Sequence, residues 1–366
     1  MKILLIGDQA DAHIAAVNWG LKKMGYAPVI WSCMNFPSKS TSFISLANET
    51  SLNFEISDEN YNSSENFDVI WNRRVSKPVA PLNSASSDHP IIFRESQSYT
   101  TSLIRTWGHS NARWVNRYDD GVIAGDKVLQ LESAKKVGFK IPKTLVTNDF
   151  EKVRRFFDEQ KEKIIYKGFR SATWVKADGS YTTLKTALVP TTAFDQPDTF
   201  KNCPGIYQEL VVKKFEVRAT VMGDFVLCGR IDSQNNGPRV DWRYDLEQDK
   251  IPLSQYDLPN EISARCVKLC RHLGLEFGCI DLIVNSDDEF IFLEVNQAGQ
   301  FLWLEDCDPN INALLKFCEF LSGRTANEAE SKEISLAAFD QSIDFKEWKF
   351  HAMMRKSNNN SVVKDY

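Results

Sequence analysis

The chain has 366 residues, 43% of them hydrophobic, with 44 Lys and Arg against 49 Asp and Glu and a formal net charge of −5 at pH 7. This length predicts two or three packed subdomains rather than one small core. The acidic balance argues against general nucleic-acid binding, because that activity requires a basic face.

Two other features bear on the cellular compartment. No apolar run approaches the ~20 residues that cross a bilayer, and the run after Met1 and Lys2 is too short for a signal peptide. The eight cysteines form no CxxC pair, so neither a zinc site nor a thiol redox motif is indicated. We therefore expect a cytoplasmic protein with reduced cysteines and no membrane partner.

The N-terminal part has the pattern of an α/β fold. Apolar periodicity predicts a strand at residues 3–6, a helix at 10–24 and strands at 28–31 and 67–71. The first loop lacks GxGxxG and Walker motifs, so Gly7 is interpreted as a structural turn. Arg73 and Arg74 follow the last of these strands, where parallel sheets face their ligands, and they are candidates to bind an acidic substrate or phosphate. Surface salt bridges are an equally good interpretation of both.

The middle of the chain begins after a boundary expected near residues 110–125. Residues 127–137 read as a helix that opens at Lys127, residues 148–161 as a charged helix, and residues 164–167 as a strand that ends at Lys167. A polar loop at 170–181 follows, and a lysine beside such a loop suits phosphate contact. For Lys167 alone, a surface lysine is the simpler interpretation.

Further along, residues 206–211 read as a strand that enters a linker, whose backbone groups can read an adenine edge. Residues 213–218 start a new strand, and residues 221–231 suggest a hairpin that turns at Gly223. The helix expected at 261–273 has apolar residues at helical spacing, which indicates core positions rather than ligands.

Two apolar strands then carry the strongest signal for chemistry. Residues 278–284 contain one acid, Asp281, and residues 290–296 end with Glu294 and Asn296, two positions apart and so on one face of a strand. A polar, turn-like segment joins the two strands and predicts a hairpin that brings Asp281 beside Glu294. Three oxygen ligands suit Mg²⁺ bound to nucleotide phosphates. The alternative, solvated acids on a half-exposed sheet, is weakened by the apolar flanks.

In this order the candidates resemble the ATP-grasp superfamily over roughly residues 100–323, with the N-terminal part similar to a pre-ATP-grasp domain. The resemblance implies that Lys127 and Lys167 contact the phosphates of ATP and that Glu216 binds ribose. The adenine would be held by Gln208, Glu209, Leu210 and Val211, and the Mg²⁺ by Asp281, Glu294 and Asn296. It also implies four segments: an N-terminal α/β pre-ATP-grasp domain (1–120), central (121–205) and C-terminal (206–323) ATP-grasp subdomains, and a polar extension (324–366).

A narrower resemblance is to the graspetide peptide maturases, the microviridin-type macrocyclases. The residues that carry it are Asn72-Arg73-Arg74, Phe93–Gln97, Lys127–Leu131, Ile141–Asn148, Val240–Arg243 and Leu293–Glu305. The chain departs from the family where it has Gln297-Ala298 in place of Pro-Asn, and where Asp232 stands at a common His position. The predicted metal asparagine is kept.

This resemblance implies an ATP-dependent ligase whose substrate is a ribosomally made precursor peptide, with leader and core. An Asp or Glu side chain would be activated as an acyl phosphate, and a Ser, Thr or Lys side chain of the same peptide would close an ester or amide ring. Arg243 is the first candidate to stabilise the acyl phosphate or oxyanion, ahead of Arg230 and Arg239. The loop at 170–179 would exclude water. The family also implies a homodimer.

Two other functions stay open from the sequence. A ligase that joins a small amine or free amino acid to a carboxylate would share the ATP site and differ only in its substrate pocket. A non-catalytic nucleotide-binding scaffold would be expected to lack at least one metal ligand, whereas all three candidates are present.

Overall fold

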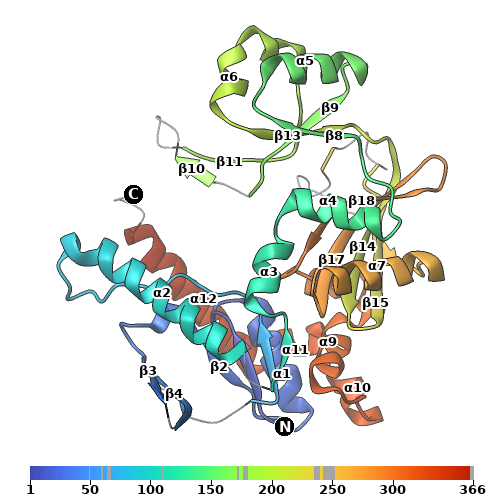
Figure 1. Ribbon diagram of the computed structural model, residues 1–366. Coiled ribbons are helices and arrows are strands. Elements are labelled where there is room, and N and C mark those ends of the chain that lie inside the picture. Colours follow the sequence, from blue (N-terminus) through green and yellow to red (C-terminus); the bar gives the residue numbers. More distant parts are fainter. Residues whose placement is uncertain are drawn as a thin grey trace.

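The computed structural model describes residues 1–48, 50–58, 61–63, 67–108, 111–170, 173–175, 180–234, 240–241 and 252–362. Three larger sheets divide this part of the chain into an N-terminal, a central and a C-terminal region (Figure 1). In Figure 1 the central region lies at the top, and the N- and C-terminal regions adjoin each other below it.

The N-terminal region confirms the expected α/β pattern. Its parallel sheet has the order β2-β1-β6-β7, from β1 (Ile3–Ile6), β2 (Val29–Trp31), β6 (Val69–Asn72) and β7 (Arg113–Val115). The same region contains helices α1 (Ala12–Lys23) and α2 (His89–Gly108). A separate small sheet is formed by β3 (Thr41–Ala47), β4 (Thr50–Asp58) and β5 (Tyr61–Ser63). Asp11 caps α1 by accepting a hydrogen bond from the His13 amide at 2.8 Å, and Gly25, at φ +81°, follows its end.

The central region is a sheet with two helices. Its strand order is β12-β9-β13-β8, from β8 (Thr144–Thr147), β9 (Ile164–Lys167), β12 (Ala187–Leu188) and β13 (Gly205–Glu209). Helices α5 (Phe150–Glu159) and α6 (Pro197–Asn202) bury their aromatic side chains against it, and β10 (Thr173–Val175) pairs with β11 (Tyr181–Thr183). Helices α3 (Tyr118–Ala124) and α4 (Lys127–Lys136) lead into this region.

The C-terminal region holds the predicted hairpin. Its sheet has the order β16-β15-β14-β17-β18, from β14 (Lys213–Met222), β15 (Phe225–Ile231), β16 (Leu253–Gln255), β17 (Phe277–Asn285) and β18 (Phe290–Asn296), with α7 (Asn260–His272) packed on it. The expected hairpin at 221–231 is confirmed as the antiparallel turn between β14 and β15. The last helices are α8 (Leu302–Cys307), α9 (Ala313–Ser322), α10 (Glu328–Glu333), α11 (Leu336–Asp340) and α12 (Ile343–Val362).

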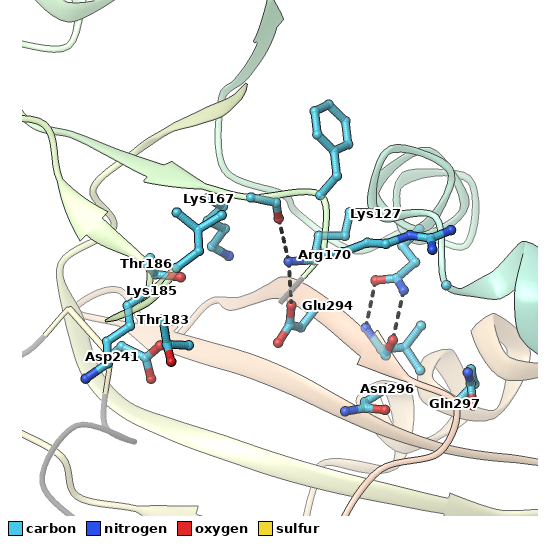
Figure 2. A pocket seen from close by; sticks show the side chains of 16 residues that line it. Lys127, Lys167, Arg170, Thr183, Lys185, Thr186, Asp241, Glu294, Asn296 and Gln297 are labelled. Carbon is cyan, nitrogen blue, oxygen red and sulfur yellow. Dashed lines mark hydrogen bonds and ion pairs between the residues drawn. The ribbon is translucent and has the colours of Figure 1, made fainter. Parts of the chain in front are cut away.

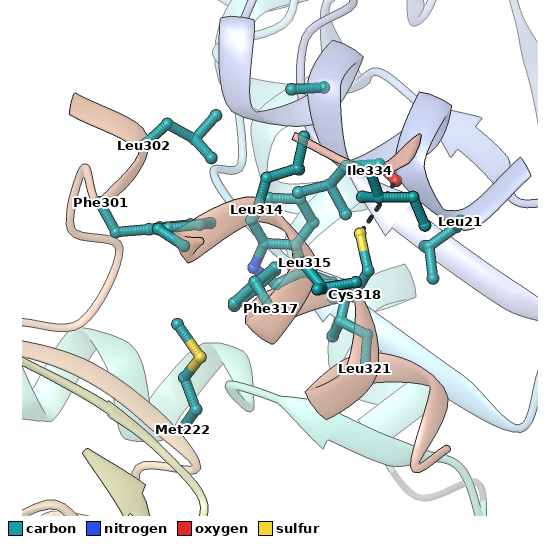
Figure 3. Close-up of a cluster of buried hydrophobic side chains, with 14 of the residues drawn as sticks. Leu21, Met222, Phe301, Leu302, Leu314, Leu315, Phe317, Cys318, Leu321 and Ile334 are labelled. Atoms are coloured by element: carbon teal, nitrogen blue, oxygen red, sulfur yellow. Dashed lines mark hydrogen bonds between the residues drawn. The ribbon is translucent and has the colours of Figure 1, made fainter. Parts of the chain in front are cut away.

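One hydrophobic cluster joins the N- and C-terminal regions. Phe317 of α9 lies at its centre, with ring centroids 4.8 Å from Trp71, 5.1 Å from Phe277 and 4.6 Å from Phe301 (Figure 3). Residues after 323, expected to form a polar extension, contribute Ile334 and Phe339 to this cluster. The two regions therefore share a core rather than meeting only through a linker.

Candidate active site

A cavity of about 460 Å³ between α4, β9 and β18 brings together residues predicted to contact phosphate and metal (Figure 2). Its lining includes Lys127, Lys167, Arg170, Lys185, Glu294 and Asn296. Lys127 Nζ donates a hydrogen bond to the Gly168 carbonyl at 2.9 Å and lies 3.8 Å from Glu294 Oε2. Both predicted phosphate lysines and two of the three predicted metal ligands thus face one space.

Local structure explains why Lys127 reaches this cavity. Asp126 caps α4 by accepting hydrogen bonds from the Val128 and Leu129 amides at 2.9 and 3.0 Å, so Lys127 occupies the first helical position. One turn on, buried Gln130 donates to the Val295 carbonyl at 2.8 Å and accepts from the Val295 amide at 3.0 Å. The helix is thereby bonded to the outer edge of β18.

The hairpin of β17 and β18 brings the predicted metal ligands together. Asp281 pairs directly with Glu294, and Cys279 pairs with Asn296. Directly opposed residues on antiparallel strands share a face, so Asp281 and Glu294 lie side by side. An irregularity in the register follows Asp281.

The donor set fits Mg²⁺ by its chemistry. Glu294 and Asn296 offer a carboxylate and an amide oxygen to the large cavity, and Asp281 and Glu294 line a smaller one beside it. Mg²⁺ takes one or two protein carboxylates and completes its shell with phosphates and water. In the part of the chain that the structure describes, no three His, Cys, Asp or Glu residues form a metal-binding group, so the amide of Asn296 is needed to complete the candidate set.

Asp281 is also bound to a buried arginine. Arg218 Nη1 donates to Asp281 Oδ1 at 2.8 Å, and the two side chains are 7% and 15% exposed. Burial alone would lower the pKa of Arg218, but Asp281, Cys279 and Glu294 together outweigh burial and raise that pKa. Arg218 was not among the predicted site residues, although its place opposite Asp281 in the sheet follows from the register.

The smaller cavity, about 50 Å³, is lined by all the residues predicted to hold adenine and ribose. These are Gln208, Glu209, Leu210, Val211 and Glu216. Ile165, Ile283 and Leu293 form an apolar part of its wall, which also includes charged residues such as Lys167, Asp241 and Glu294. An apolar wall with a few polar groups suits a purine, and this cavity is called the apolar slot below.

Glu216 already has two partners in this cavity. Lys213 Nζ lies 2.6 Å from Glu216 Oε1, and the Ser233 hydroxyl donates to the same oxygen at 2.8 Å. Burial raises the pKa of Glu216, although Lys213 and Ser233 oppose the shift. A ribose at this position would therefore meet a carboxylate that is oriented in advance.

Arg73 and Arg74 border a third cavity, about 310 Å³, whose lining also includes Lys77, Thr101, Tyr118 and Gln297. Gln297 lines both this cavity and the large one, so the two adjoin. The lining residues contain three cationic side chains and no acid. Arg74 is exposed, whereas Arg73 is 1% exposed and its Nε lies 3.4 Å from Asp11 Oδ2.

Of the catalytic candidates, only Arg230 lies among the described residues. Arg230 donates to Asp232 Oδ1 at 2.9 and 2.7 Å and stacks 4.1 Å from the Phe215 ring, and it lines none of the three described cavities. Arg239 and Arg243 lie outside the described residues, as does most of the loop at 170–179. Lys185, Gln130 and Gln297 also line the large cavity but were not predicted as site residues. Gln130 and Gln297 lie within segments that carry the family resemblance, whereas Lys185 has no local motif.

His13 is a buried neighbour of this site. Its Nε2 accepts hydrogen bonds from the amides of Phe301 at 3.1 Å and Leu302 at 3.4 Å, and its Nδ1 lies 3.6 Å from Asp11. Burial lowers the pKa of His13, although Asp11 opposes the shift. An Nε2 that accepts two N–H groups belongs to a neutral imidazole with its proton on Nδ1.

We expect the free energy of unfolding to fall more steeply below pH 6.5 in the wild type than in His13→Gln. The unfolded histidine has its ordinary pKa of 6.5, and the folded one a lower pKa. Below pH 6.5 the unfolded state therefore binds more protons, and stability is lost as the pH falls toward the folded value. Urea unfolding at pH 7.5 and 5.5 would measure this, and equal pH-dependent losses in both proteins would contradict it.

No family model and no curated protein matches the chain. Among solved structures, a RiPP-associated ATP-grasp ligase from Chryseobacterium gregarium, in complex with ADP and a leader and core peptide, is 24% identical, with a TM-score of 0.80 over 89% of this chain and 98% of that one. The macrocyclase MdnC from Microcystis aeruginosa MRC, bound with precursor peptide MdnA, is 24% identical, with a TM-score of 0.77 over 88% and 100%.

A third solved structure is also similar to this chain over most of its length. The ATP-grasp ligase PsnB, complexed with a phosphomimetic variant of its minimal precursor, Mg and ADP, is 20% identical, with a TM-score of 0.67 over 88% of this chain and 97% of that one. A membrane-spanning helix is not found in the part of the chain that the structure describes.

The similarity to these three structures shows that the chain has the ATP-grasp fold, preceded by an N-terminal α/β domain.

Proposed function

We propose that this protein is an ATP-dependent, ADP-forming ligase that closes ester or amide cross-links within a ribosomally made precursor peptide. The observation that carries the proposal is the meeting of three cavities. The apolar slot and the cavity with both lysines share Lys167, Asp241 and Glu294, and the basic cavity adjoins the latter through Gln297. A nucleotide and an acidic substrate would then meet in the cavity that contains both lysines.

The similar structures add the class of substrate. Two of them contain a precursor peptide or its leader and core, and a third contains a precursor variant with Mg and ADP. We carry this chemistry to the present chain: ATP with Mg²⁺, and a peptide with carboxylate side chains. The segments 1–120, 121–205, 206–323 and 324–366 are proposed as its N-terminal domain, central subdomain, C-terminal subdomain and C-terminal extension.

The homodimer that the family resemblance implies would be tested by analytical sedimentation of the purified protein.

The reaction would proceed in two balanced steps. A substrate carboxylate attacks the γ-phosphorus of ATP, the bond to the β-γ bridging oxygen breaks, and an acyl phosphate and ADP result. A hydroxyl or amine of the same peptide then attacks the acyl carbon, loses its proton and expels phosphate. Lys127 and Lys167 would offset the charge on the transferring phosphoryl group. Asp281, Glu294 and Asn296 would hold Mg²⁺, which when bound neutralises phosphate charge.

The experiment that tests this function is mass spectrometry of candidate precursor peptides with Thr/Glu or Lys/Glu segments, incubated with the protein, ATP and Mg²⁺. We expect loss of one water per ring together with ADP release, and loss of both activities in Asn296→Ala. ADP release without peptide dehydration would replace the proposal with a small-substrate ligase. No nucleotide turnover with any carboxylate would support the scaffold alternative instead.

The basic cavity yields a separate prediction. Arg74→Ala should raise the KM for an acidic peptide about fivefold and leave the KM for ATP unchanged, since an exposed cation that contacts only the substrate contributes about 1 kcal/mol to binding. Steady-state ADP release at varied peptide and ATP concentrations measures both constants. Arg94→Ala, which removes an exposed arginine of α2 that lines none of the described cavities, is the matched control. An unchanged peptide KM in Arg74→Ala would exclude this cavity from substrate binding.

A further inference from the structure

The loop at residues 297–302, between β18 and α8, is held through its backbone by buried side chains from distant parts of the chain. Asn116 donates to the Gln297 carbonyl at 3.0 Å. Arg73 donates to the carbonyls of Ala298 and Gly299, the second at 3.3 Å. His13 accepts from the amides of Phe301 and Leu302 at 3.1 and 3.4 Å. All three side chains come from the N-terminal region.

These three side chains are themselves fixed. Their exposed fractions are 8% for His13, 1% for Arg73 and 3% for Asn116. Asn116 also donates to the Phe277 carbonyl at 2.8 Å and accepts from the Phe277 amide at 2.9 Å, and Asp11 lies between His13 and Arg73 at 3.6 and 3.4 Å. Hydrogen bonds in such a desolvated setting are stronger than exposed ones and hold their partners in one arrangement.

The loop in turn orients Asn296, the residue that precedes it. The Ala298 amide donates to Asn296 Oδ1 at 3.3 Å, and the Gly299 amide donates to the Asn296 carbonyl at 3.1 Å. A Cβ at Gly299 would collide with Cys279 of β17, so the loop lies directly against the hairpin. An amide oxygen has two lone pairs, and one remains for a cation after the bond from Ala298.

We propose that His13, Arg73 and Asn116 are positioning residues through which the N-terminal region sets the Mg²⁺-binding orientation of Asn296. The inference rests on the proposed function, because it takes Asn296 as a metal ligand. His13 is the most informative of the three. It lines none of the three cavities of the site, so any effect it has on metal binding passes through the loop.

The test is the Mg²⁺ concentration at which binding of ADP is half-maximal, measured by calorimetry without peptide or turnover. His13→Ala should raise it about tenfold, the lower range for residues that support a metal ligand. His13→Gln, whose amide oxygen can accept the same N–H groups, should lie closer to the wild type. Arg73→Lys keeps a cation beside Asp11, but its shorter side chain should not reach the two carbonyls to which Arg73 Nη1 donates. The same rise is expected in this variant, which replaces His13→Ala in the test if His13→Ala fails to fold.

Two controls separate the possible failures. Leu21→Ala empties a fully buried position on the same helix as His13, so it should lower the melting temperature without moving the Mg²⁺ midpoint. Asn296→Ala tests the metal role itself. A raised midpoint in Asn296→Ala with an unchanged midpoint in His13→Ala and Arg73→Lys would overturn the positioning role alone. Unchanged midpoints in all variants would overturn the metal role of Asn296 and with it the proposed site.

Discussion

Replacing Glu294 by glutamine should lower the rate of ATP-dependent peptide dehydration about 10³-fold, because stabilisation of phosphoryl charge by a bound metal contributes several kcal/mol. Glu294 is the one predicted metal ligand that lines both the lysine-containing cavity and the apolar slot. Glutamine keeps its shape but removes its charge. It also removes the carboxylate that lies 3.8 Å from Lys127 Nζ.

The measurement is steady-state ADP release, with mass spectrometry of the peptide. Glu289→Gln is the matched control, because Glu289 lies on the same hairpin, is partly exposed, and pairs with Lys140 away from the cavities. We expect the control to retain wild-type turnover. A Glu294→Gln protein with turnover within tenfold of the wild type would remove Glu294 from the metal site.

The hairpin of β17 and β18 could be predicted because its signal is local. Glu294 and Asn296 are two positions apart on a strand, a short polar turn precedes that strand, and Asp281 lies at the distance that an antiparallel pairing requires. The structure confirms this register, with Asp281 opposite Glu294. The phosphate-binding roles of Lys127 and Lys167 were predicted only from the family resemblance. The fold adds that both lysines line one cavity.

Non-local contacts explain what the sequence could not show. Arg73 was interpreted as a ligand or a surface ion pair, yet it is buried and its carbonyl partner Ala298 lies 225 positions away. Arg230, a catalytic candidate, instead pairs with Asp232, two residues on. In the extension after residue 323, Ile334 and Phe339 enter the core singly, without the periodicity that marks a helix face.

Replacing Arg218 by methionine should destabilise the protein by about 3–5 kcal/mol, the usual cost of leaving one member of a buried ion pair without its partner. Both side chains of the Arg218–Asp281 pair are mostly buried, so solvent screening reduces this figure little. Arg218 Nη2 also donates to the Gln300 carbonyl at 3.0 Å, and this second bond would be lost too. Urea unfolding monitored by tryptophan fluorescence gives the free energy.

Combining Arg218→Met with Asp281→Asn should recover most of that stability, because no buried charge is then left alone. The double variant should not recover Mg²⁺-dependent ADP binding if Asp281 is a metal ligand, so stability and metal binding would separate. Arg271→Met is the control: its pair with Asp224 is 66% and 78% exposed, and its loss should change stability by less than about 1 kcal/mol. If the double variant restored ADP binding along with stability, Asp281 would be a structural partner of Arg218 rather than a ligand, and Glu294 and Asn296 would hold the cation with the phosphates alone.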